Sequence, residues 1–150
     1  MCPQTTSQIT ACDAVIKLQN VEGTLLDMSG SSNSVTMRFL QPTGQLRTFG
    51  TRFYIRGQCG QDAELSMRAV YSEDDDEALN CIRDWYFNYP GTTRAFEVYL
   101  PDAAAGSDKY AFTVLLEDFE IPAESGNADP VLCAVTLKPT GTFSWTKVAS

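Results

Sequence analysis

Residues 109–121 read "KYAFTVLLEDFEI", a long stretch in which apolar side chains alternate with other side chains. In its first part the large apolar residues occupy even positions: Tyr110, Phe112, Val114 and Leu116. In its second part Phe119 and Ile121 occupy odd positions. Successive side chains of a β-strand point to opposite faces, so the pattern predicts one long strand with an apolar face. The change of phase predicts a β-bulge near Glu117 and Asp118.

The same alternation extends outward from this stretch in both directions. It occurs in residues 14–19, 34–40, 52–57, 64–71, 94–100, 131–137 and 142–148. Turn-favouring residues separate the stretches, and "SGSSNS" at residues 29–34 predicts a hairpin between the first two strands. Cys133 is in phase with Val131 and Val135, so we expect a small buried side chain there and not a nucleophile. The chain is therefore predicted to be mainly β.

One segment has the period of a helix. Its apolar residues are three and four positions apart: Ala78, Leu79, Ile82, Trp85, Tyr86 and Tyr89. Pro90 and Gly91 supply a stop, while Ser72 followed by Asp75 has the form of a capping box. We therefore predict an amphipathic helix over about residues 73–89.

Five consecutive carboxylates open this predicted helix, and we call them the acidic block: Glu73, Asp74, Asp75, Asp76 and Glu77. Carboxylates at a helix N-terminus are favourable because they face unsatisfied N–H groups and the positive end of the dipole. A metal site is a weaker interpretation, since successive helical residues fan around the axis by about 100° each. A helix start does not require five acids, so a further role at a protein interface stays open.

The composition excludes several classes of function. The 150 residues are 43% hydrophobic, which fits a single globular domain. A net charge of -8 disfavours autonomous binding to nucleic acid or to an anionic membrane. Histidine is absent from the sequence, which excludes Ser-His-Asp and Cys-His catalysis. Glu117 and Asp118 are adjacent on a strand and point to opposite faces, so we expect no catalytic carboxylate pair. We expect a protein that is not an enzyme and needs no cofactor.

The cysteines and the amino-terminal sequence indicate a compartment. The five cysteines are scattered without any C-x-x-C pair, so neither a disulfide framework nor a structural zinc site is expected. The opening "MCPQTTSQITACDAV" lacks the basic and apolar regions of a secretory signal. Long apolar runs that would span a bilayer are also missing. We expect a soluble protein that is made inside a cell and does not enter a membrane.

Charge is distributed unevenly along the chain. Residues 28–61, the basic segment, hold no acidic residue and four arginines: Arg38, Arg47, Arg52 and Arg56. The rest of the chain holds all nineteen acidic residues and the other seven basic residues. Two complementary surfaces of this kind would allow copies to bind head to tail. The alternative is that the arginines lie on solvated strand faces, where charge clusters contribute little.

The order of these elements resembles that of the major tail tube protein of long-tailed bacteriophages. The resemblance is clearest from Arg94 to Trp145, in the strand that ends at Pro101, the long strand at 110–121, the turn at 126–129 and the strand that ends before Gly141. It implies a β-sandwich or barrel-like domain of antiparallel sheets with one flanking helix. Six copies would close into a ring, and stacked rings would form a tube through which viral DNA passes without specific binding.

The resemblance also implies partners and locations. Tape measure and terminator proteins are expected partners, the virion tail is the expected location, and assembly would occur in the host cytoplasm. A short amino-terminal segment, about residues 1–12, is expected to be mobile, and a long loop is expected within about residues 28–61. Tail terminators and the tubes of contractile secretion machines share the fold, so a terminator or another ring protein remains an alternative.

The resemblance also implies roles for the charged residues. Arg47 and Arg52, together with Arg38 and Arg56, are candidates to contact carboxylates of an adjacent subunit, and the acidic block is the candidate partner. The helix of that family lies outside the inner sheet, so the acidic block is not expected to line the channel. Carboxylates on strands are better placed for this, and Asp13 and Asp27 are the candidate lumen carboxylates.

A ligand-binding β-sandwich is the rival class. Five aromatic residues could stack on a sugar or a peptide if they were exposed: Tyr54, Trp85, Tyr86, Tyr89 and Tyr99. Trp85 and Tyr89 share a helical face with Ile82, however, and this spacing favours packing against the sheet.

Overall fold

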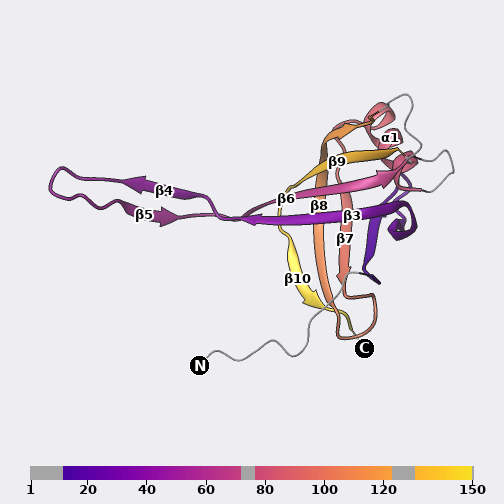
Figure 1. Cartoon of the computed structure of the whole chain (residues 1–150), viewed down its shortest axis with the longest axis horizontal. Helices are drawn as coiled ribbons and strands as arrows, with labels where there is room; N and C mark the ends of the chain where they lie inside the picture. The colour runs from indigo at the N-terminus through magenta and orange to yellow at the C-terminus, as the bar shows by residue number, and fades with distance from the viewer. Residues whose placement is uncertain (1–11, 72–76, 123–130, 150) are drawn as a thin grey trace.

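The computed structural model describes residues 12–71, 77–122 and 131–149, and Figure 1 shows their arrangement. In chain order its elements are β1 (Val15–Gln19), β2 (Leu25–Asp27), the 3-10 helix η1 (Ser29–Ser31), β3 (Ser32–Leu40), β4 (Thr43–Leu46), β5 (Ile55–Gln58), β6 (Asp62–Val70), α1 (Ala78–Asn88), β7 (Arg94–Leu100), β8 (Asp108–Glu120), β9 (Leu132–Pro139) and β10 (Ser144–Lys147).

Eight strands of the described residues form one antiparallel sheet. Its order is β2-β1-β7-β8-β9-β6-β3, and β10 also pairs with β8. β9 and β10 use the same edge of β8 in succession, because Pro139 lies opposite Val114 and Ser144 lies opposite Ala111. In Figure 1 β3, β6 and β9 run across the view while β7, β8 and β10 run down it. The sheet is therefore strongly twisted, as expected of a large antiparallel sheet.

Aromatic contacts show that the sheet also curls back on itself. Phe39 of β3 lies 6.1 Å from Phe112 of β8 between ring centroids, although β9 and β6 separate these two strands in the sheet. Phe143 joins them, with its ring centroid 5.7 Å from that of Phe112. Burial of the enclosed face removes apolar side chains of β1, β6, β7, β8 and β9 from water. The predicted class, mainly β with antiparallel sheets in a β-sandwich or barrel-like form and one flanking helix, is confirmed.

The register of β8 confirms the predicted bulge. Leu116 lies opposite Leu137 and Asp118 lies opposite Thr136, so the pairing with β9 shifts between Leu116 and Asp118. The extra residue returns Phe119 to the apolar face, where it packs against the core. Cys133 of β9 is fully buried as predicted, and burial raises the pKa of its thiol.

The helix is correct in type and wrong in its start. α1 begins at Ala78, whereas the sequence predicted about residue 73, and the backbone of Glu77 is extended. The capping residue comes from elsewhere, because the Ala78 N–H donates to the hydroxyl of buried Ser31 at 3.0 Å. The predicted cap at Ser72 lies outside the described residues. Trp85 is buried as expected and its indole N–H donates to the Thr92 carbonyl at 2.9 Å.

The predicted hairpin at residues 29–34 is wrong. β1 pairs with β2 and β7, while β3 pairs with β6. The reason is that the chain after β2 stays bound to β1: the Met28 N–H donates to the Ile16 carbonyl and the Ile16 N–H donates to the Ser29 hydroxyl. A direct turn from residues 14–19 into residues 34–40 is thereby prevented.

Ser31→Ala is predicted to destabilise the fold by about 1–2 kcal/mol. The substitution removes the acceptor of the Ala78 N–H, a helix N-terminal donor in a buried position. Ser66→Ala, at an exposed site on β6, is the matched control and should change the free energy of unfolding by less than about 0.5 kcal/mol. Urea denaturation compares them; equal stability of the two variants would show that Ser31 is not the cap.

Candidate assembly interface

A two-stranded ribbon projects from the body, and we call residues 43–58 the arm. β4 and β5 pair antiparallel within it, with Gly44 opposite Gly57 and Leu46 opposite Ile55. It continues beyond the ends of β3 and β6 and points away from the sheet (Figure 1). Every residue of the arm is exposed except Thr51, which is half-buried. Sequence analysis predicted a strand at 52–57 and did not predict β4.

One face of the arm is cationic. Gln45 and Arg56 lie opposite each other, and the alternation of the strands places Arg47 and Tyr54 on the same face. The guanidinium carbons of Arg47 and Arg56 each lie 5.9 Å from the centroid of the Tyr54 ring. Tyr54 thus separates two like charges and holds both by cation–π attraction. Such planar guanidinium groups are suited to bind carboxylates in a bidentate manner.

The opposite face of the arm is apolar. It carries the cross-strand pair Leu46 and Ile55, which are 63% and 60% exposed. Phe53, in the bend just before β5, adds a ring that is 79% exposed. Phe49 at the turn is fully exposed. An isolated two-stranded hairpin is at best marginally stable in water, and exposed apolar clusters of this kind mark interaction sites. The arm therefore has the features of a segment that is completed by a partner.

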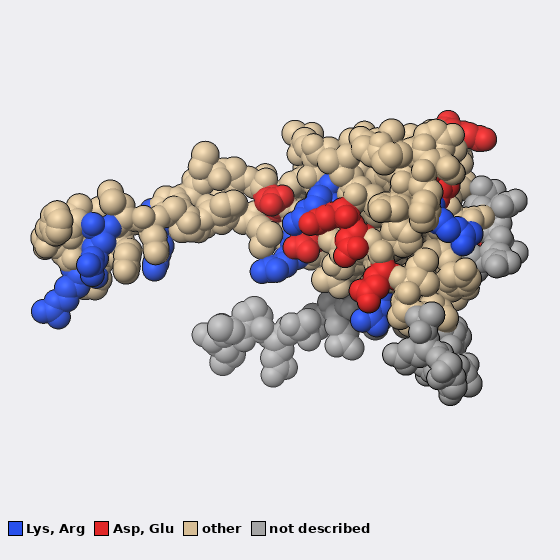
Figure 2. All heavy atoms as spheres, turned by 90° about the horizontal axis from the view of Figure 1, so that it is seen from above, with Lys and Arg blue, Asp and Glu red and all other residues tan. Residues whose placement is uncertain are grey.

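The structure brings together three of the four predicted arginines. Arg47, Arg52 and Arg56 all belong to the arm, where Figure 2 shows basic side chains and no acidic ones on the face in view. Arg38 is in β3 on the body and lies opposite Glu64 of β6. Of the acidic block, Glu73, Asp74, Asp75 and Asp76 lie outside the described residues. Glu77 is half-buried at the start of α1.

The two candidate lumen carboxylates are both exposed. Asp13 precedes β1, and Asp27 ends β2 opposite Lys17. The Asp27 carboxylate accepts a hydrogen bond from the Ser29 N–H at 2.9 Å. Hydrogen bonds from Ser29, with a smaller contribution from Lys17, lower the pKa of Asp27 below its usual value. Asp27 thus stays ionised at neutral pH, and the placement of Asp13 and Asp27 in a channel lumen stays a prediction.

The outer face of the sheet mixes both charge signs (Figure 2). Lys109 pairs with Glu97 at 3.6 Å, and Lys138 pairs with Glu64 at the same distance. Tyr99 is 7% exposed and donates its hydroxyl to Glu97. Burial and this carboxylate raise the pKa of Tyr99 to about 12. The named charges of this face are therefore paired with one another, whereas the charges of the arm are all of one sign.

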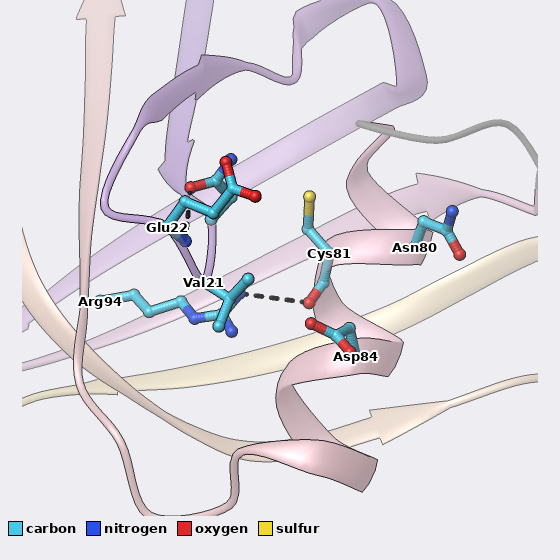
Figure 3. A pocket seen from close by; sticks show the side chains of 7 residues that line it. Val21, Glu22, Asn80, Cys81, Asp84 and Arg94 are labelled. Carbon is cyan, nitrogen blue, oxygen red and sulfur yellow. Dashed lines mark hydrogen bonds between the residues drawn. The ribbon is translucent and has the colours of Figure 1, made fainter.

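A polar cavity of about 430 Å³ lies between α1 and the turn after β1 (Figure 3). Arg94 of β7 reaches it from the core, where its guanidinium carbon lies 4.9 Å from the centroid of Trp85. Its Nη1 donates to the Cys81 carbonyl at 3.3 Å, and its Nη2 has no acceptor among the described residues. Burial lowers the pKa of Arg94. Glu22 and Asp84 complete the charged lining.

The aromatic residues of the rival ligand-binding interpretation do not share this cavity. Trp85 is 1% exposed in the core, Tyr99 is engaged with Glu97, and Tyr54 is on the arm. Tyr89, which was expected to pack against the sheet, is 43% exposed, so that expectation is wrong. A shared stacking platform for a sugar or peptide is thus absent from these five positions.

Sequence reasoning missed an exposed aromatic patch on the body. Tyr86 and Phe87 of α1 and Phe119 of β8 contact one another, with the Tyr86 ring centroid 5.0 Å from Phe87 and 5.3 Å from Phe119. Tyr86 and Phe87 are 54% and 66% exposed. Phe87 breaks the apolar spacing of the helix, and this departure was the available signal.

Comparisons with known proteins place the fold. The sequence matches no protein-family model and no curated protein. Among solved structures the chain has the fold of tail tube proteins of phage-like particles. It superposes on the tail of an empty gene transfer agent particle with a TM-score of 0.69 at 16% identity, covering 93% of this chain and 99% of that one.

Two further structures show the same fold. The SPP1 tail tube gives a TM-score of 0.67 at 16% identity over 95% of this chain and 80% of that one. A chain from the sheath-tube complex of an extracellular contractile injection system, PVC, gives a TM-score of 0.69 at 11% identity over 95% of this chain and 94% of that one.

Trypsin is predicted to cleave the unassembled chain first in the arm, at Arg47, Arg52 and Arg56. Exposed ribbons open easily, whereas Arg38 and Arg68 lie where the two nine-residue strands β3 and β6 pair with each other. The nicked halves should stay together through that pairing and elute as one species. Mass spectrometry of a time course identifies the sites; earlier cleavage at Arg68 than in the arm would contradict this account.

Proposed function

We propose that this chain is a structural subunit of a phage-type tail tube. Six copies would close into a ring, and rings would stack through the arm into a tube that conducts DNA. The fold likeness to the tail of a gene transfer agent, refined with C6 symmetry, and to the SPP1 tail tube supports this proposal. The observation that carries it is the arm, a ribbon with one cationic face and one apolar face and with both faces exposed.

The charge of the chain is suited to a conduit. Each copy carries -8, so a ring of copies repels phosphates and makes no net counterion-releasing contact with passing DNA. Asp13 and Asp27 are our candidates to line the channel, and Asp27 is held ionised by its contacts with Ser29. We further propose that the protein is not an enzyme, resides in the virion tail after assembly in the host cytoplasm, and meets tape measure and terminator proteins there.

A tail terminator is a second candidate, because a specific likeness favours it. The chain superposes on the sheath/tube terminator of the same PVC injection system with a TM-score of 0.68 at 11% identity. A terminator would form a single ring that does not polymerise. The two candidates therefore differ in an observable property, the length of the assembly.

Purified wild-type protein is predicted to form hollow tubes or stacked rings as its concentration rises. Light scattering should report a mass that increases beyond six copies, and negative-stain electron microscopy should show a central channel. A single ring whose mass stays constant would favour the terminator. A monomer at every concentration would contradict self-assembly.

Charge reversal of the arm is predicted to stop tube elongation. Arg47→Glu with Arg52→Glu would place carboxylates against the carboxylates of the adjacent subunit, for which the acidic block, Glu73 to Glu77, is our candidate partner. We expect a folded protein that yields no long tubes. The matched control is Arg47→Lys with Arg52→Lys, which keeps the charge and should retain shorter tubes. Normal tubes from the glutamate variant would refute the arginine contact.

A further inference from the structure

We propose that the aromatic patch of Tyr86, Phe87 and Phe119 receives the apolar face of the arm from a second copy of this chain. This inference rests on the proposed function and adds to it the surface that accepts the arm. The arginine contact uses the opposite face of the ribbon, so the two contacts are separate. An arm that lies between two neighbouring subunits would contact one of them with its cationic face and the other with its apolar face.

The first argument is that both surfaces are apolar and uncovered. The arm presents Leu46, Phe53 and Ile55, each at least 60% exposed. Gly44 and Gly57 lie opposite each other on the same face, so the ribbon there has no side chains that would hold a partner away. The patch presents two exposed rings, Tyr86 and Phe87, in edge contact with the half-buried ring of Phe119, and aromatic side chains are enriched where protein interfaces are buried.

The second argument is the charge that surrounds each surface. The arm carries Arg47, Arg52 and Arg56 and no acid. The patch is flanked by carboxylates on the same two elements, Asp84 of α1 and Glu117, Asp118 and Glu120 of β8, against two basic residues, Arg83 of α1 and Lys138 of β9, which lies 4.0 Å from Glu117. Opposite charge around two apolar surfaces steers their encounter and fixes which surfaces pair.

The third argument is placement. α1 and the end of β8 lie at the opposite end of the long axis from the arm (Figure 1). The arm of one copy therefore cannot fold back onto its own patch. Two different complementary surfaces on one chain make a head-to-tail contact, which propagates instead of closing into a two-fold dimer. This geometry identifies the occupant as a second copy.

A complementation experiment tests the proposal. The arm variant is Leu46→Thr with Ile55→Thr, which removes apolar surface and places a β-branched residue at both strand positions. The patch variant is Tyr86→Ala with Phe87→Ala, which leaves Trp85 and Ile82 in the core. Val21→Ser, at a residue that is 46% exposed outside both surfaces, is the matched control. Circular dichroism checks folding, and Phe87→Asp alone replaces the patch variant if the double substitution unfolds.

Each variant alone lacks one half of the contact and should not extend, whereas the control should assemble as the wild type does. A mixture of the two variants restores one intact arm and patch per pair of copies. Light scattering should therefore detect a species of twice the mass of either variant alone, with no longer assemblies. Extension by the patch variant alone, or no doubling in the mixture, would overturn this inference while wild-type tubes left the proposed function intact. A monomeric wild type would overturn both.

Discussion

The apolar face of the arm cannot be buried by the arm itself. In a two-stranded ribbon the side chains of one face have neighbours only on that ribbon, so Leu46, Phe53 and Ile55 stay in water. Fully burying one side chain of this size contributes roughly 1.5–3 kcal/mol. The isolated chain forgoes that stabilisation, and only another surface can supply it. The proposed self-association would supply such a surface from a second copy.

The body fixes where the arm points. The arm leaves the pairing of β3 with β6, which continues in register from Val35 opposite Met67 to Leu40 opposite Asp62. Phe39, next to the last residue of β3, packs on Phe112 and Phe143 from the other half of the curled sheet. The bulge in β8 keeps its apolar face continuous, so that the same core supports α1. Core packing and the direction of the arm are thus parts of one arrangement.

Local patterns predicted most elements, and contacts between distant residues account for the errors. The alternation in residues 109–121 was sufficient to predict β8 and its bulge. The start of α1 was wrong because its cap is Ser31, 47 positions away, which no capping pattern can reveal. The hairpin at residues 29–34 was wrong because side-chain and backbone bonds hold Met28 and Ser29 to β1. β4 was missed because Thr43, Gly44 and Gln45 carry no apolar alternation.

The candidate site, too, has a part that the sequence predicted and a part that only the folded structure shows. The basic segment was visible in the sequence, and three of its arginines do gather on the arm. The separation of cationic and apolar residues onto opposite faces depends on the β4 and β5 register, which the sequence does not state. The aromatic patch joins α1 to β8, elements that are distant in the chain, so only the folded structure brings it together.

Amide hydrogen exchange across a concentration series tests most directly whether the arm is completed by other copies. Exchange reports local opening, so an exposed ribbon should exchange rapidly in dilute protein while the core strands β6 and β9 are protected. On assembly, residues 43–58 and the carboxyl-terminal half of α1 should gain protection together, with β6 and β9 unchanged. Assembled protein in which the arm still exchanges as fast as in the monomer would contradict the account.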